Sequence, residues 1–150
     1  MKHTIPLTTL GVSLAILCLL GTVPRAQAQD PQCSNATLNG SFGFTGTGTV
    51  FNPSASLFAQ VGRQTFDGKG NTDATATTSV NGATFPVTIK GTYTVNVDCT
   101  GSLTLEVSPV DITVHADFVI VSDGAEFRAI VTDPGSVVTF VARKQFRKEN

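Results

Sequence analysis

One stretch of the sequence, residues 84–98, constrains the fold more than any other, because its side chains alternate between two kinds along its whole length. One parity is mostly polar, rich in threonine. The other parity consists of Phe85, Val87, Ile89, Gly91, Tyr93, Val95 and Val97. A period of two residues places successive side chains on opposite faces of a β-strand. We therefore predict a long strand over 84–98 whose apolar face is covered by neighbouring strands.

Residues 1–28 have the organisation of a cleaved signal peptide. A basic start precedes an apolar run over 7–23, and Ala26-Gln27-Ala28 has the small-x-small form of a signal-peptidase site. A membrane anchor is less favoured because glycine and serine interrupt a short run, and a lipid-modified Cys18 is less favoured because a bulky leucine precedes it. We therefore expect a secreted or periplasmic protein, cleaved after Ala28, that keeps no stable membrane span.

Residues 29–150 are predicted to form a single domain, since roughly 120 residues can build one hydrophobic core but not two. Four of the eight basic residues in this part, Arg143, Lys144, Arg147 and Lys148, gather in a C-terminal tail, and the remainder is acidic. A solvated chain end is the more ordinary interpretation of such a tail than contact with an anionic surface. Because the domain has no basic stripe, we expect no nucleic-acid partner.

Only Cys33 and Cys99 remain once the signal peptide is removed. Two leftover cysteines in an exported protein are expected to form a disulfide. A metal site is disfavoured, because two cysteines and His115 are too few ligands for a tetrahedral cage without help from carboxylates. We predict the disulfide Cys33–Cys99, no metal and no cofactor.

Other segments also have a strand-like period of two residues, separated by turn-forming residues. The stretch 45–56 is rich in glycine, threonine and serine, which predicts a loop. The segments predicted upstream of the central strand are strands over 36–45, 56–66 and 72–80, a short edge strand at 47–51, and turns at Asp67–Asn71 and Asn81-Gly82.

Turn positions downstream predict which residues face each other across hairpins. We take Cys99-Thr100-Gly101 as a three-residue loop with Gly101 left-handed, and Asp123-Gly124 and Pro134-Gly135 as two-residue turns. The resulting pairs are Val97–Leu103, Val95–Leu105, Tyr93–Val107, Ile120–Phe127, Phe118–Ala129, Ala116–Val131, Val131–Val138 and Ala129–Phe140. One apolar face therefore continues from strand to strand, with Ile112, Val114, Ala116, Phe118 and Ile120 on it.

The predicted fold class is all-β, with a single antiparallel meander barrel of about eight strands over 29–150. Closure is favoured because it removes the exposed edge strands of an open sheet. The alternative is a two-sheet β-sandwich.

The segments CSNATLNGSFGF, VGRQTFDGKGN, GTYTVNVDCTGSL and DFVIVSDGAEFRAIVTDPG, with the closing ARKQ, resemble a group of small secreted bacterial proteins. That group resembles the allene-oxide-cyclase-like and dirigent-like barrels. The resemblance covers nearly all of the predicted domain and is most specific in FDGKGN and DCTG. It implies a barrel that can enclose an apolar small molecule, and in some relatives a cyclase that works without a cofactor. The polar catalytic residues of those cyclases do not map onto this sequence, so none is assigned.

Aromatic side chains on the apolar faces are the candidate ligand-binding residues: Tyr93, Phe85, Phe118, Phe127 and Phe140. Tyr93 is the only tyrosine, and its buried hydroxyl would need a hydrogen-bond partner or a ligand. Packing in the core is the more ordinary role for such a residue.

A candidate polar patch lies on the opposite face, where the predicted registers gather His115, Asp117, Glu126 and Arg128. Asp117 and Arg128 become diagonal neighbours, close enough for an ion pair. Such a group could act as general acid and base, but an exposed cross-strand salt bridge is the simpler interpretation.

Two hypotheses about function follow. The first is a secreted barrel that binds an apolar small molecule in its lumen or is purely structural. The second is a cofactor-independent cyclase or isomerase acting on a hydrophobic substrate. A Gly-x-Ser-x-Gly elbow and a His-x-x-x-His pair are both absent from the sequence, so the usual signatures of hydrolases and metalloenzymes are missing. Inward polar residues beside an open cavity would favour the enzyme.

Overall fold

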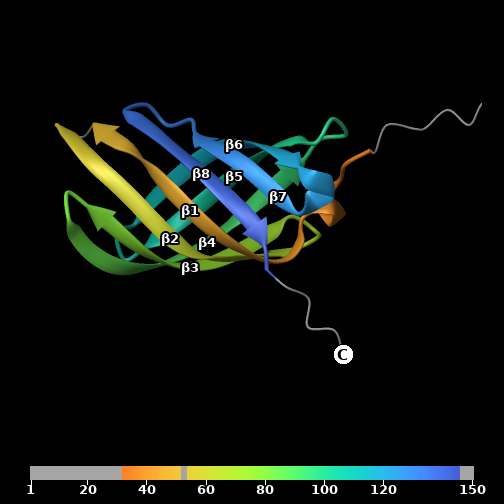
Figure 1. Ribbon diagram of the computed structural model, residues 1–150, viewed down its shortest axis with the longest axis horizontal. Coiled ribbons are helices and arrows are strands. Elements are labelled where there is room, and N and C mark those ends of the chain that lie inside the picture. The colour runs from red at the N-terminus through yellow and green to blue at the C-terminus, as the bar shows by residue number, and fades with distance from the viewer. Residues whose placement is uncertain (1–31, 52–53, 146–150) are drawn as a thin grey trace, which may run out of the picture.

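The computed structural model describes residues 32–51 and 54–145, so the predicted signal peptide lies outside the described part of the chain. Consecutive antiparallel strands form a closed barrel in the order β1 to β8 (Figure 1). The strands are β1 (Asn39–Phe51), β2 (Ala55–Asp67), β3 (Asn71–Val80), β4 (Ala83–Val95), β5 (Thr100–Ser108), β6 (Ile112–Val121), β7 (Glu126–Val131) and β8 (Ser136–Lys144). Two short 3₁₀ turns, η1 (Asn35–Thr37) and η2 (Ser122–Gly124), complete the fold. Within the described ranges, no helix is long and apolar enough to cross a membrane.

Closure is made by the first and last strands. β1 pairs with β2 on one side and with β8 on the other, so that Phe44 lies opposite both Gly62 and Ala142. This pairing leaves neither β1 nor β8 with an open edge. The predicted antiparallel meander barrel is confirmed, and the two-sheet sandwich is wrong.

The central strand β4 has one buried and one exposed face, as its alternation predicts. Val87, Ile89 and Tyr93 are buried inside the barrel, whereas Thr88 and Lys90 face outward. The strand ends at Val95 rather than continuing to residue 98. Val97, assigned to the apolar face from the sequence, lies in the following turn and is 70% exposed.

The predicted register between β4 and β5 is wrong, because the chain turns earlier than expected. Tyr93 lies opposite Leu103 instead of Val107. The Asn96 N–H donates to the Thr100 carbonyl at 2.8 Å, and Cys99, with a φ of 67°, takes the left-handed position predicted for Gly101. The shift spans an even number of residues, so each side chain keeps its predicted face.

The loop predicted over 45–56 is wrong for most of its length, whereas the short strand predicted at 47–51 is present as the end of β1. β1 continues as a regular strand to Phe51, and β2 begins at Ala55. A Cβ atom at Gly46 would overlap the ring of Phe140, and one at Gly48 would overlap the backbone of β8. These glycines allow β1 and β8 to approach closely, so here glycine serves strand packing and not a turn.

The registers predicted for the last three strands are confirmed. Ile120 lies opposite Phe127, Phe118 opposite Ala129, and Ala129 opposite Phe140. The β6–β7 connection is longer than the predicted Asp123-Gly124 turn, because η2 begins at Ser122. The inward parity is unaffected by this difference.

The barrel has two unlike ends. We call the end that carries η1 and the β2–β3, β4–β5 and β6–β7 turns the closed end, and the opposite end the open end. At the closed end, the predicted Cys33–Cys99 disulfide is present, with Cα atoms 5.0 Å apart, and ties the N-terminal segment to the β4–β5 turn. Leu38 follows η1 and is completely buried. Figure 1 shows η1 and η2 together at this end.

An aromatic cluster fills the barrel beneath this segment. The ring centroids of Phe42 and Phe66 are 5.5 Å apart, those of Phe66 and Tyr93 are 5.0 Å apart, and those of Phe66 and Phe127 are 5.5 Å apart, all with edge-to-face geometry. Each of these four rings is at most 3% exposed. Edge-to-face aromatic pairs add to the stabilisation from burial, so the closed end is a solid core.

Candidate functional site

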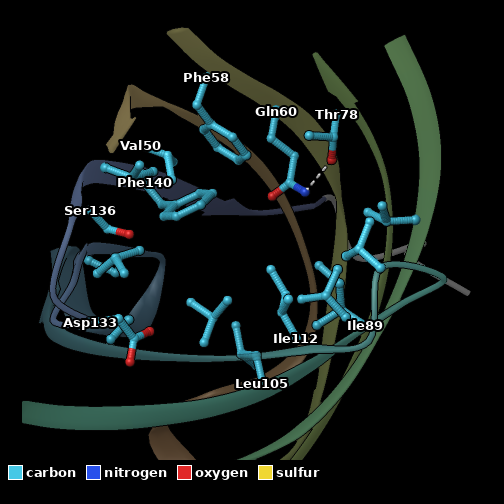
Figure 2. A pocket seen from close by; sticks show the side chains of 18 of the residues that line it. Val50, Phe58, Gln60, Thr78, Ile89, Leu105, Ile112, Asp133, Ser136 and Phe140 are labelled. Carbon is cyan, nitrogen blue, oxygen red and sulfur yellow. Dashed lines mark hydrogen bonds between the residues drawn. The ribbon is translucent and has the colours of Figure 1, made fainter. Parts of the chain in front are cut away.

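A cavity of about 550 Å³ enters the barrel from the open end. It is bounded by inward side chains of the strands and by the open-end turns, and Figure 2 shows part of its lining. The lining residues are Phe44, Val50, Phe51, Ser56, Phe58, Gln60, Gln64, Thr78, Val80, Phe85, Val87, Ile89, Leu103, Leu105, Val107, Val110, Ile112, Thr113, Val114, Ala116, Phe127, Ala129, Val131, Asp133, Pro134, Gly135, Ser136, Val138 and Phe140.

The walls of the cavity are largely hydrophobic but differ from side to side. Phe140 contacts Phe44 and Phe58, with ring centroids 6.0 and 6.2 Å apart, and this places aromatic rings along one wall. Figure 2 shows Phe58 and Phe140 across the cavity from the aliphatic side chains of Leu105 and Ile112. Such a lining can remove most of the surface of an apolar molecule from water.

Two glutamines of β2 bring amide groups to this hydrophobic space. Gln60 donates from Nε2 to Oγ1 of Thr78 at 2.7 Å, and Gln64 donates from Nε2 to Oγ1 of Thr72 at 3.0 Å. The Thr72 hydroxyl in turn donates to a backbone carbonyl, that of Thr65, at 2.9 Å. Hydroxyls of β3 therefore hold both amides on the β2–β3 side of the lumen.

Asp133 lies at the rim and is the only titratable residue among the described residues that line the cavity. Its carboxylate accepts the backbone N–H of His115 at 2.7 Å and lies 2.8 Å from Nδ1 of the same histidine. These two hydrogen bonds, the backbone one first, hold the pKa of Asp133 below its usual value. Within 32–51 and 54–145, no group of three or more histidine, cysteine and carboxylate side chains is placed to hold a metal ion.

The candidate ligand-binding residues fall into two groups. Phe85, Phe127 and Phe140 line the cavity, whereas Phe118 and Tyr93 do not. The Tyr93 hydroxyl points to the closed end, where it lies 3.0 Å from the Asn35 carbonyl and 2.9 Å from the Leu38 carbonyl and donates to them. Burial raises the pKa of Tyr93. Tyr93 therefore joins the N-terminal segment to the barrel and does not line the cavity.

The candidate polar patch lies on the outer wall and is divided by the structure. Glu126 accepts from Arg128 at 3.0 Å and from Arg143 at 2.7 Å, and these arginines lower its pKa. The ion pair expected between Asp117 and Arg128 is replaced by the one with Glu126. His115 is bonded to Asp133 at the other end of the barrel. The patch therefore does not form one acid–base group.

Sequence reasoning overlooked Gln60, Gln64 and Thr78 as cavity residues. A signal for the glutamines was present, because they share the inward parity of Phe58 and Phe66 on β2. Polar residues on an otherwise apolar parity indicate either a hydrogen-bonded core position or a wet lumen. The extent of the cavity depends on how the open end is covered, which alternation does not reveal.

Comparison with known proteins supports the barrel architecture but identifies no family. No protein-family model matches the sequence, and no curated protein matches it. Among solved structures, a redesigned β-barrel, mFAP1, bound to DFHBI, is similar, with a TM-score of 0.53 and 20% identity, over 73% of this chain and 97% of that one. A second redesigned β-barrel, b11L5F_LGL, is similar, with a TM-score of 0.52 and 20% identity, over 75% of this chain and 95% of that one. These likenesses support the class already defined by the strand order, a small closed antiparallel β-barrel.

Proposed function

We propose that this chain is an exported protein that binds an apolar small molecule in the open half of its barrel. The observation that carries the proposal is the cavity itself. Its volume of about 550 Å³ lies inside the range of roughly 300–1,000 Å³ of small-molecule sites, and its lining is hydrophobic with few polar groups. Lumen side chains such as Phe85 and Leu105 are only half-buried, so a ligand that covered them would remove further apolar surface from water.

Burial of apolar surface would drive this binding. Each Å² of apolar surface removed from water contributes about 25 cal/mol, and a ligand in this lumen would cover both itself and the walls. The closed end needs no such ligand, because protein side chains already fill it. A packed scaffold beside a preformed cavity lowers the ordering cost of binding.

Two further findings support parts of the proposal. The structural neighbour mFAP1 was solved bound to DFHBI, so a barrel of similar fold is compatible with a small-molecule partner. The Cys33–Cys99 disulfide fits an oxidising compartment, and with the predicted signal peptide it supports export. The resemblance to allene-oxide-cyclase-like and dirigent-like barrels stays a prediction and points to the same class of ligand.

Binding is favoured over the cyclase or isomerase alternative by the chemistry of the lining. Inward polar residues are present, but Gln60, Gln64 and Thr78 are amides and a hydroxyl that do not serve as ordinary general acids or bases. The one lining carboxylate, Asp133, is at the rim and already bonded to His115. The lumen therefore offers shape together with amide and hydroxyl groups, which suits recognition.

The test is a fluorescence titration with the uncharged probe N-phenyl-1-naphthylamine. The probe should bind the wild-type protein with a blue-shifted, enhanced emission, because the lumen excludes water. Leu105→Trp, which fills the cavity, should weaken binding at least about tenfold. Thr104→Trp, the neighbouring outward position on β5, is the matched control and should bind as the wild type does. Equal binding by the wild type and Leu105→Trp would show that the probe sits elsewhere.

A further inference from the structure

Gln60 is held in place from one side only. It lies on β2 directly opposite Thr78 of β3, and the Thr78 side chain that accepts its Nε2 hydrogen is only 4% exposed. In the structure the amide nitrogen, Nε2, is the end of Gln60 turned toward β3, where the Thr78 hydroxyl accepts from it at 2.7 Å. The other end, Oε1, must then face away from Thr78.

That carbonyl oxygen is directed into the lumen. Figure 2 shows the Gln60 oxygen pointing into the cavity, on the side away from the dashed bond to Thr78. Among the described residues, the bond to Thr78 is the only one that the Gln60 side chain makes. Phe58 and Phe140 stand beside it, so the lumen presents a hydrogen-bond acceptor in hydrophobic surroundings. A ligand that covers this oxygen without a donor would leave it unpaired, which is unfavourable.

The charge of the lining excludes a different set of ligands. No lysine, arginine or histidine belongs to the described lining, and the one charged residue, Asp133, is negative and lies at the rim. A carboxylate deep in the lumen would lose its hydration without gaining a cation. A carboxylate left at the mouth would face Asp133.

From these observations we propose that the lumen selects an uncharged apolar molecule that carries a hydrogen-bond donor, and that Gln60 is the specificity-determining acceptor. The proposal rests on the ligand-binding function proposed above and names the chemical class of that ligand. An alcohol on a hydrocarbon skeleton belongs to this class, as does an aromatic secondary amine, which stays uncharged near neutral pH. A fatty-acid anion and a purely aprotic molecule of the same length do not.

The experiment is a competition assay in which matched ten-carbon compounds displace N-phenyl-1-naphthylamine below their aggregation concentrations. 1-Decanol carries a donor, 1-methoxydecane has the same chain without one, and decanoate at pH 8 carries a charge. On the wild type, 1-decanol should displace the probe at concentrations about tenfold lower than either of the other two. Equal potency of the alcohol and the ether, or of the alcohol and the carboxylate, would overturn the proposal.

Variants assign the preference to Gln60. Gln60→Leu keeps the size of the side chain and removes the acceptor, so the ratio of ether to alcohol concentration should fall to about one. Thr78→Val frees the amide and should lower the ratio, while Thr77→Val, the outward neighbour on β3, should leave it unchanged. A wild-type ratio retained by Gln60→Leu would place the donor contact elsewhere and contradict the assignment.

Ligand binding and donor selectivity are distinguished by separate outcomes of these experiments. If the probe does not bind at all, the proposed ligand-binding function is wrong. If the probe binds and is displaced without regard to donor or charge, only the selectivity is wrong. The comparison on the unmutated protein decides this even if a variant fails to fold.

Discussion

The closed and open ends of the barrel are made from the same kinds of residue and yet are organised differently. At the closed end, Phe42 and Phe66 are at most 1% exposed and packed by other rings, with the disulfide and η1 across the top. At the open end, Ile112 is 52% exposed and Phe51 is 51% exposed, although both line the cavity. Alternation supplies an apolar inner face at both ends.

A closed β-barrel has a lumen to fill, and the contrast between the two ends shows that the covering segment decides how it is filled. Residues 32–38 bring Leu38 and backbone acceptors over one end, so the aromatic rings there interlock and the Tyr93 hydroxyl has partners. Only turns border the other end of the described barrel. One end therefore supplies stability and the other is available for a ligand.

The largest expected effect is on the aromatic core. Phe66→Ala removes a ring that contacts three others, so the free energy of unfolding should fall by about 3–5 kcal/mol. Leu105→Ala, at the cavity wall, should cost less than about 2 kcal/mol, because this side chain is already half-exposed. Urea unfolding of both variants measures the difference. Equal losses would mean that the open end is packed as tightly as the closed end.

The disulfide should stabilise the closed end without shaping the cavity. Replacing Cys33 and Cys99 together by alanine should lower the free energy of unfolding by roughly 2–5 kcal/mol, since the cross-link restricts the unfolded chain. Chemical denaturation gives this number, and probe titration is the control. Affinity for N-phenyl-1-naphthylamine should stay within about twofold of the wild type. A large loss of affinity would show that the two ends are coupled.

Tyr93 gives a smaller effect with a pH signature. Tyr93→Phe should cost about 1–2 kcal/mol, because the carbonyls of Asn35 and Leu38 lose their hydroxyl donor. Burial raises the pKa of Tyr93 above 10.0, so the unfolded chain ionises first. Its contribution to stability is therefore complete below about pH 10 and is lost as pH rises through the folded pKa. Denaturation at pH 8 and pH 11 should show a steeper decline for the wild type than for Tyr93→Phe, and parallel declines would refute this.

The smallest effect concerns two turn carboxylates, one at each end. Asp67 accepts the backbone N–H groups of Lys69, Gly70 and Asn71 and the Asn71 side-chain amide, and these bonds, the side-chain one first, lower its pKa from 3.8 to about 2. The stability it contributes is present above about pH 4 and lost as pH falls toward 2. Carboxyl-carbon NMR titration should place Asp67 near 2 and Asp133 below 3.8. A titration midpoint near 3.8 for Asp67 would show that these hydrogen bonds are not formed. Asp67→Asn should remove the loss of stability that the wild type shows as pH falls from about 4 toward 2.

Much of the fold could be predicted because the alternation of apolar and polar side chains along a strand can be read from neighbouring residues in the sequence. The parity of Phe118 and Ile120, together with a short turn, fixes the β6–β7 register, and the structure has that register. The β4–β5 register could not be fixed in the same way. A register shifted by an even number of residues keeps Val95 and Leu103 on the same face, so hydrophobic pattern alone does not distinguish the two.

The candidate site was less predictable for two physical reasons. Gly46 and Gly48 are signals for loops in sequence, whereas in the barrel they permit close contact with β8. The cavity is a property of volume, set by which segment covers which end, and no local pattern encodes it. Aromatic residues of equal character, Phe118 and Phe140, thus lie respectively outside and inside the lining.

The central claim, a ligand in the open half of the lumen, is tested most directly by methyl NMR of the protein labelled at isoleucine, leucine and valine. Addition of N-phenyl-1-naphthylamine should shift the methyl signals of Ile89, Leu105 and Ile112 and give ligand-to-methyl contacts there. The methyl signals of Leu38 and Ile120 at the closed end, and of the outward Val137, should stay in place. Contacts confined to Val137 or other outer-wall methyls, with the lumen methyls unchanged, would contradict the account.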